Sequence, residues 1–101
     1  MDHLDVALTA IADPIRRSIL QRLAHGPATA GQLATLHSVS RPAVSRHLRV
    51  LREAGLVRAT PRGRHLWYEA QAHPLLTVEQ WLRDVTKRMA DAPRLISEET
   101  P

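Results

Sequence analysis

One stretch of the sequence, residues 39–55, gathers side chains that can bind a polyanion. Its cationic and hydroxyl-bearing members include Arg41, Ser45, Arg46, His47, Arg49 and Arg52. Arginine presents a planar fork of N–H donors that fits phosphate oxygens and the edge of a guanine, and serine can contact either kind of group. The sequence offers no nucleophile with a base at a meaningful spacing and no glycine-rich phosphate loop. The expected chemistry is therefore recognition of a polyanion, and we do not expect an enzyme.

A helix must position these side chains, and the sequence marks where that helix begins and ends. Ser40 is a suitable N-cap, because its hydroxyl can accept hydrogen bonds from the free amides of the first turn. Gly55 follows the last periodic residue, where a left-handed residue is common. Val44, Leu48 and Leu51 are spaced i, i+4 and i+7, so they share one buried face. The arginines lie opposite, which predicts a helix that enters the major groove of DNA.

The flanking sequence predicts a small, mainly helical fold. Asp13 and Pro14 mark the start of a helix, because Asp is favoured at the N-cap and Pro at the first helical position. Predicted helices cover about residues 5–12, 14–24, 30–37 and 75–92, and predicted strands cover about 56–60 and 65–70. Arg62 and Arg64 occupy the turn between the strands. The element order is α-α-α-α-β-β-α, with the hairpin as a wing.

The helix that precedes the arginine-rich one begins with a capping box. Thr29 can accept from the amide of Gln32, and the Gln32 side chain can reach back to the Thr29 amide. We expect this helix to bury Leu33, Ala34 and Leu36. Because only a few residues separate the two helices, the pair is a helix-turn-helix in outline.

The charge is distributed unevenly along the chain. Between Pro14 and Tyr68 there are ten arginines and one acid, Glu53, whereas the two flanks hold four basic and nine acidic residues. The formal charge is therefore +9 in the centre and −5 in the flanks, which agrees with the net +4 of the whole chain. This asymmetry predicts a polyanion-binding centre between ends that have another role.

Length and composition narrow the class of protein further. The chain has 101 residues and no cysteine, so we expect one small domain without disulfides or thiolate metal sites. No apolar run approaches the roughly 20 residues of a transmembrane helix, and no signal-peptide pattern is visible. We therefore expect a cytoplasmic protein that has no contact with a membrane.

Two segments resemble the ArsR/SmtB family of bacterial winged-helix repressors. Residues 11–20, IADPIRRSIL, are similar to the family's opening "LADPTRRRIL", and residues 40–57, SRPAVSRHLRVLREAGLV, are similar to "SQPAVSRHLKVLREAGLV". The Gly63-Arg64 turn and the following Trp67-Tyr68 resemble the family's wing pattern, "GR…YY". The resemblance covers about residues 8–72 and is most specific in the second segment.

This resemblance implies a homodimer that binds a palindromic operator in double-stranded DNA and represses transcription, often of its own operon. It also implies that the first and last helices form the dimer interface. We accordingly expect a single winged helix-turn-helix domain over residues 1–101. Within it, the helix-turn-helix covers about 29–54, the wing about 56–71, and the dimerisation helices about 3–12 and 75–92.

The candidate site residues fall into two sets. The DNA-binding candidates are Thr29, Gln32, Ser40, Arg41, Ser45, Arg46, His47, Arg49, Arg62 and Arg64. The dimer-interface candidates are Leu4, Leu8, Ile11, Val78, Trp81, Leu82, Val85 and Met89. Each assignment has an alternative. His47 can be a packed core residue, Thr29 and Gln32 can serve only as a cap, and the stripe around Trp81 can be an intrachain core or line a ligand pocket.

The metal sites of the family do not transfer to this sequence. The arsenic and cadmium sensors carry Cys-x-Cys in the third helix, where this chain has Ala30, Gly31 and their neighbours. The zinc sensors carry an Asp-x-His and His-x-x-Glu/His set on the last helix, where this chain has no histidine after His73. We therefore expect no cofactor. Two alternatives stay open. One is a sensor of a metal or small molecule with a non-classical site, which for a metal would combine His3, His65 or His73 with carboxylates across the dimer. The other is a protein-interaction module that does not bind DNA.

Overall fold

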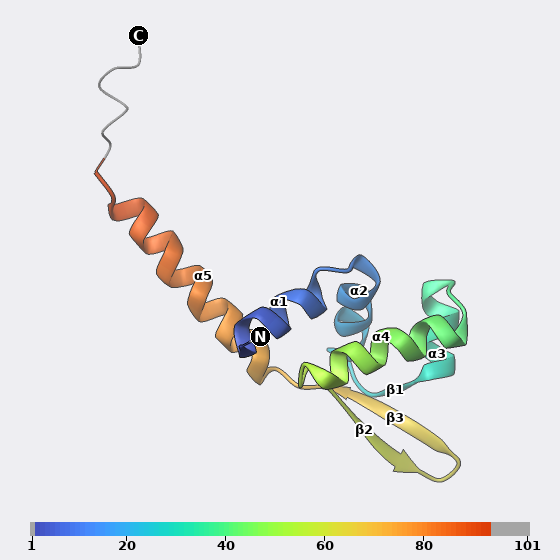
Figure 1. Cartoon of the computed structure of the whole chain (residues 1–101). Coiled ribbons are helices and arrows are strands. Elements are labelled where there is room, and N and C mark those ends of the chain that lie inside the picture. The colour runs from blue at the N-terminus through green and yellow to red at the C-terminus, as the bar shows by residue number, and fades with distance from the viewer. Residues whose placement is uncertain (1, 94–101) are drawn as a thin grey trace.

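The computed structural model describes residues 2–93, which form a mainly α winged helix-turn-helix (Figure 1). Its elements in chain order are α1 (His3–Ile11), α2 (Pro14–Leu23), β1 (Ala28–Thr29), α3 (Ala30–His37), α4 (Arg41–Glu53), β2 (Val57–Arg62), β3 (His65–Ala70) and α5 (His73–Asp91). The predicted fold class is confirmed. The strand β1 is an addition that the sequence pattern did not predict.

Side-chain caps define where α2 and α4 begin. Asp13 Oδ2 accepts from the amides of Ile15 at 2.8 Å and Arg16 at 3.1 Å, as expected for an N-cap. Ser40 Oγ accepts from the amide of Ala43 at 3.2 Å. At the other end of α4, Gly55 adopts φ 75°, a left-handed conformation that glycine reaches without a steric penalty.

The short helix α3 has both predicted halves of its capping box. The Thr29 hydroxyl accepts from the Gln32 amide at 3.2 Å, and Gln32 Oε1 accepts from the Thr29 amide at 3.0 Å. The prediction that Leu36 is buried is wrong, because this side chain is 60% exposed. The buried face of α3 is centred on Leu33 and Ala34, and Leu36 lies more than a quarter-turn of the helix away from its centre.

The strands form one antiparallel sheet in the order β1-β3-β2. The pairs Val57↔Ala70 and Arg62↔His65 mark the two ends of the β2–β3 ladder, so Gly63 and Arg64 alone connect the strands. Gly63 has φ 59°, a conformation that this tight connection requires of its first residue. The sequence pattern missed β1 because a strand of two residues shows no alternation of polar and apolar side chains.

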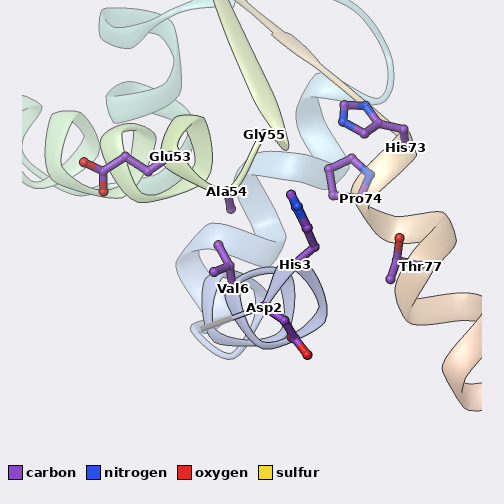
Figure 2. A pocket seen from close by; sticks show the side chains of 9 residues that line it. All are labelled: Asp2, His3, Val6, Glu53, Ala54, Gly55, His73, Pro74 and Thr77. Carbon is purple, nitrogen blue, oxygen red and sulfur yellow. The ribbon is translucent and has the colours of Figure 1, made fainter.

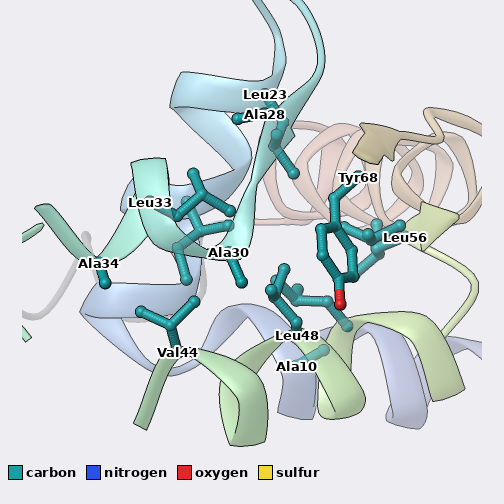
Figure 3. Packing of buried hydrophobic residues seen from close by; sticks show 13 residues of the cluster. Ala10, Leu23, Ala28, Ala30, Leu33, Ala34, Val44, Leu48, Leu56 and Tyr68 are labelled. Carbon is teal, nitrogen blue, oxygen red and sulfur yellow. The ribbon is translucent and has the colours of Figure 1, made fainter. Parts of the chain in front are cut away.

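One hydrophobic core joins the helix-turn-helix to the sheet (Figure 3). Val44, Leu48 and Leu51 of α4 are fully buried, as their spacing predicts. Leu56 and Tyr68 pack above Leu48 and bring the sheet into the same cluster. The buried face of α4 is therefore fixed against the fold, and its opposite face is left on the surface.

The last helix, α5, runs away from the rest of the molecule after passing α1 (Figure 1). Val78 is buried, whereas Trp81, Leu82 and Met89 further along α5 are exposed and Val85 is half-buried. In residues 2–93 no helix combines the length and the apolar character needed to cross a bilayer. The apolar stripe of α5 is thus covered near its start and open further along.

Candidate nucleic-acid interface

The exposed face of α4 carries the polar side chains that the sequence pattern placed there. Exposed residues on this face are Arg41, Ser45, Arg46, Arg49 and Arg52. Within residues 2–93, none of these five side chains makes a hydrogen bond or an ion pair with another part of the protein. Their donors are therefore available to an external acceptor. Four unneutralised guanidinium groups on one helix face create a strongly positive surface.

The wing adds two more exposed arginines. Arg62, which the sequence pattern placed in the turn, is instead the last residue of β2 and pairs with His65. Its guanidinium carbon lies 5.9 Å from the centroid of the Trp67 ring, within the range of a cation–π contact. Arg64 occupies the tip of the hairpin. Arg58, near the start of β2, lies 4.0 Å from Glu69 and is partly neutralised by it. The positive charge of the wing is thus concentrated toward its tip.

The first turn of α3, the first turns of α4 and the wing meet around a small cavity of about 260 Å³. Its polar lining includes Thr29, Arg41, Ser45 and Arg64, which come from three separate elements. Arg41 crosses the start of α3, where its Nη1 lies 4.0 Å from the position that a Cβ on Gly31 would take. Two arginines and the amide end of a helix favour an anion, and the cavity is large enough for a phosphate group.

Three of the predicted contact residues are engaged in caps. Thr29 and Gln32 bond to each other's backbone, and Ser40 accepts from the first turn of α4. A hydroxyl that accepts such a bond retains its own proton, so Thr29 and Ser40 can still donate to a phosphate. The structure therefore supports the capping interpretation for all three and leaves their contact with DNA as a prediction.

His47 lies away from the exposed arginine face. Its side chain is 22% exposed, and its Nδ1 lies 3.4 Å from Arg16 Nη1 and 3.9 Å from Asp13 Oδ2. The structure thus places His47 beside Arg16 and Asp13 and not in the apolar core, and its contact with DNA stays a prediction. The sequence pattern left this open because position 47 borders both faces of the helix.

The arginines of α2 have a different use, which the sequence pattern did not reveal. Arg16 and Arg17 donate to the last carbonyls of α1, at residues 9–12, over distances of 2.6 to 3.1 Å. Arg22 donates to the carbonyl of Gly26 at 2.9 Å. The last carbonyls of a helix have no partners within that helix, so arginines at this end satisfy them.

Asp13 completes this arrangement electrostatically. The hydrogen bond from the Arg16 amide lowers the pKa of Asp13 below its ordinary value of 3.8. The Ile15 amide and the Arg16 charge add to this lowering, while partial burial opposes it. The carboxylate is therefore held in its ionised, capping form.

Known proteins resemble this chain in both sequence and architecture. A family model described as a helix-turn-helix domain matches residues 11–59. The HTH-type transcriptional regulator Rv2034 of Mycobacterium tuberculosis is 52% identical over 65 residues, which are 64% of this chain and 61% of that protein. The transcriptional repressor SdpR of Bacillus subtilis is 34% identical over 73 residues, which are 72% of this chain and 81% of that one.

A solved structure of an ArsR family transcriptional regulator superimposes with a TM-score of 0.82 at 31% identity, over 90% of this chain and 94% of that one. The chain belongs to the ArsR family. It spans less than two thirds of the length of Rv2034, although it covers most of SdpR and of the solved regulator. Membership of a family of transcriptional regulators agrees with the expectation that the chain is not an enzyme.

In this ArsR-family chain the candidate dimer residues divide by burial. Val78 is already buried within the single chain, so its side chain belongs to the packing of α5 against α1. Trp81, Leu82 and Met89 are 44%, 50% and 72% exposed. Leu76, which the 3.6-residue period did not include, is also exposed and lines a shallow groove with Leu4 and Trp81. Leu4, Leu8, Ile11 and Val85 are half-buried.

Two of the histidines considered for a metal site line one cavity (Figure 2). His3 extends from α1 toward Pro74 at the start of α5, and His73 precedes that proline. Asp2 and Glu53 also line this cavity of about 380 Å³. Across residues 2–93, however, no group of three His, Cys, Asp or Glu side chains has a geometry that could hold a metal ion. His65 lies elsewhere, at the start of β3.

Proposed function

We propose that this chain is a homodimeric repressor that binds a palindromic operator in double-stranded DNA, acts in the cytoplasm and controls its own operon. One observation carries the proposal. The exposed face of α4 and the tip of the wing present six arginines, none of which pairs with an acid within residues 2–93. A single protein surface that concentrates unneutralised charge in this way is suited to the phosphate backbone of DNA.

The shape of the surface favours a duplex over other polyanions. A protruding helix with an arginine and serine face fits the major groove, where arginine can bond to guanine O6 and N7. We assign the reading of bases to Arg46 and Arg49, because they lie beyond the first turn of α4 and outside the anion cavity. Thr29, Arg41 and Arg64 are assigned to phosphates at the cavity, and Arg62 to the backbone or the minor groove beside the wing.

Dimerisation is supported by the open apolar stripe of α5. Trp81, Leu82 and Met89 are large apolar side chains on a helix that extends beyond the body of the protomer. A second copy would remove this surface from water, which stabilises a complex by about 25 cal/mol for each Å² of apolar area. A solved Mycobacterium bovis domain described as homodimeric has a TM-score of 0.70 at 24% identity, a likeness that concerns the fold.

The DNA-binding part is tested by an electrophoretic shift with the duplex upstream of the protein's own gene and a scrambled duplex of the same composition. We expect the upstream duplex to be bound more tightly, with log affinity falling by roughly 0.9 per neutralised phosphate for each unit of log salt. A folded protein that shifts neither duplex at low salt would instead be a protein-interaction module. Equal binding to both duplexes would remove the claim that the protein acts on its own operon.

The dimer is tested separately by light scattering on Trp81→Glu. A carboxylate in an apolar interface is left desolvated and unpaired, so we expect this variant to be monomeric at concentrations where the wild type is dimeric. Leu36→Glu is the matched control, because Leu36 is a comparably exposed apolar residue on α3. If both variants remain dimeric, the α5 stripe is not the interface.

A further inference from the structure

A polar link joins the recognition helix α4 to the end of α1 through Arg16 of α2. Arg16 Nε donates to the Ala10 carbonyl at 2.6 Å, and its Nη2 donates to the Thr9 carbonyl at 3.0 Å. Its remaining nitrogen, Nη1, lies 3.4 Å from His47 Nδ1 on α4. A guanidinium is planar and holds its donors in fixed directions, so it restrains both partners relative to each other.

The donor and the acceptor in this link follow from the chemistry of the groups. Arginine can only donate, so His47 Nδ1 is the acceptor in its contact with Arg16. Asp13 Oδ2 is 3.9 Å from the same Nδ1, which is too far for a hydrogen bond. Asp13 instead holds the first turn of α2 through two backbone amides. Arg16 and His47 thus connect α2, α1 and α4, while Asp13 fixes the start of α2.

The remaining attachment of α4 to the other helices is apolar. Val44, Leu48 and Leu51 are buried, but apolar contact is non-directional and resists a small rotation of the helix only through packing. Within the part of the chain that the structure describes, no other side-chain hydrogen bond joins α4 to another helix. The Arg16–His47 contact is therefore the directional restraint on how α4 is turned.

We propose that Arg16 and His47 are positioning residues that set the orientation of α4 relative to α1. The proposal depends on the proposed function, since α1 lies beside the proposed dimer face and α4 carries the DNA-reading face. In a dimer, the orientation between these helices fixes the separation of the two recognition helices. It therefore selects the half-site spacing that both helices can reach together, ordinarily about 34 Å between centres. Neither residue contacts DNA in this account.

The test measures binding of the full chain to operators whose half-sites are moved apart or together in steps of a base pair. His47→Leu removes the acceptor at nearly the same volume. His47→Asn places an amide oxygen close to the position of Nδ1 and retains an acceptor for Arg16. For His47→Leu we expect the affinity ratio between the preferred and the next spacing to fall at least about threefold, and for His47→Asn to stay within about twofold of the wild type.

Each outcome bears on one claim. If the wild type binds no operator, or shows no preferred spacing, the proposed function fails first. If the wild type has a preference and His47→Leu keeps the same ratio, the positioning role is wrong, whatever the change in overall affinity. A spacing preference lost in both His47→Leu and His47→Asn also contradicts it. If circular dichroism shows that His47→Leu does not fold, Arg16→Lys is used in its place. An ammonium keeps the positive charge but cannot reach all three acceptors of Arg16. We expect the same fall in the affinity ratio for this variant.

Discussion

The arginines of α2 and the arginines of α4 and the wing are the same residue type in two different roles. Arg16, Arg17 and Arg22 donate to backbone carbonyls of their own chain. Arg41, Arg46 and the wing arginine Arg64 have no acceptor within residues 2–93. The first group stabilises the fold, and the second is available to a ligand. A count of positive charges along the sequence cannot separate these roles, because both groups lie in the same basic segment.

The location of helix ends explains the difference. The last carbonyls of α1 supply acceptors for Arg16 and Arg17, whereas within residues 2–93 no carbonyl accepts from the exposed arginines of α4. Where the C-terminal end of a helix is near, the guanidinium donates to its last carbonyls and contributes to the fold. Where none is near, the charge is exposed. Substitutions of arginines, of a helix cap and of leucines in these regions test this comparison.

The largest effect on DNA binding is expected for Arg41→Ala combined with Arg64→Ala at the anion cavity. If each arginine makes one charged hydrogen bond to phosphate, the pair contributes about 3 kcal/mol, so affinity for any duplex should fall about 100-fold. The slope of log affinity against log salt should fall by about 2. Fluorescence anisotropy over a salt series measures both. Arg83→Ala on α5 is the control, and an equal loss there would mean that net charge alone drives binding.

A smaller effect is expected on the α2 side for Asp13→Ala, which removes the N-cap of α2. Loss of the cap should lower the free energy of unfolding by about 0.5–2 kcal/mol in chemical denaturation at neutral pH. Because folding depresses the pKa of Asp13, its ionic stabilisation is present above the ordinary carboxyl pKa and is lost as the pH falls through the folded value.

Asp13→Asn separates the two parts of that prediction. Asparagine keeps the cap acceptor but has no charge, so this variant should retain most of the stability at neutral pH and lose the acid-dependent part attributable to residue 13. A wild type and an Asp13→Asn variant with superimposable stability curves between neutral and acid pH would show that the carboxylate charge is irrelevant.

The smallest effect is expected for Leu36→Ser. This side chain is 60% exposed, so the free energy of unfolding should change by no more than about 0.5 kcal/mol. Leu33, three residues earlier on the same helix, is fully buried, and Leu33→Ala should cost about 2–5 kcal/mol. Comparable losses in thermal or chemical denaturation would restore the original expectation that Leu36 is a core residue.

Much of the fold was predictable because its signals are local. The caps at Asp13, Thr29 and Ser40, the spacing of Val44 with Leu48, and the turn at Gly63 each depend on residues close in sequence. The exposed face of α4 follows from the same spacing.

The remaining features depend on contacts between elements. The position of His47 requires Arg16, which is 31 residues away, and the burial of Val78 requires α1. The strand β1 exists only because Ala28 pairs with Tyr68 on β3. Periodicity within one segment carries no information about such partners, so it left His47 open and placed Val78 with the exposed side chains of α5.

The most direct test of the central claim compares Arg46→Ala with Arg17→Ala in the same two assays. For Arg46→Ala we predict a loss of roughly 1–3 kcal/mol in binding to the specific duplex and a change in unfolding free energy within about 0.5 kcal/mol. For Arg17→Ala, which loses its bonds to the Ile11 and Ala12 carbonyls, we predict a stability loss of about 1 kcal/mol and DNA affinity within about twofold of the wild type. Equal losses of DNA affinity in the two variants would contradict the division of the arginines into folding and binding groups.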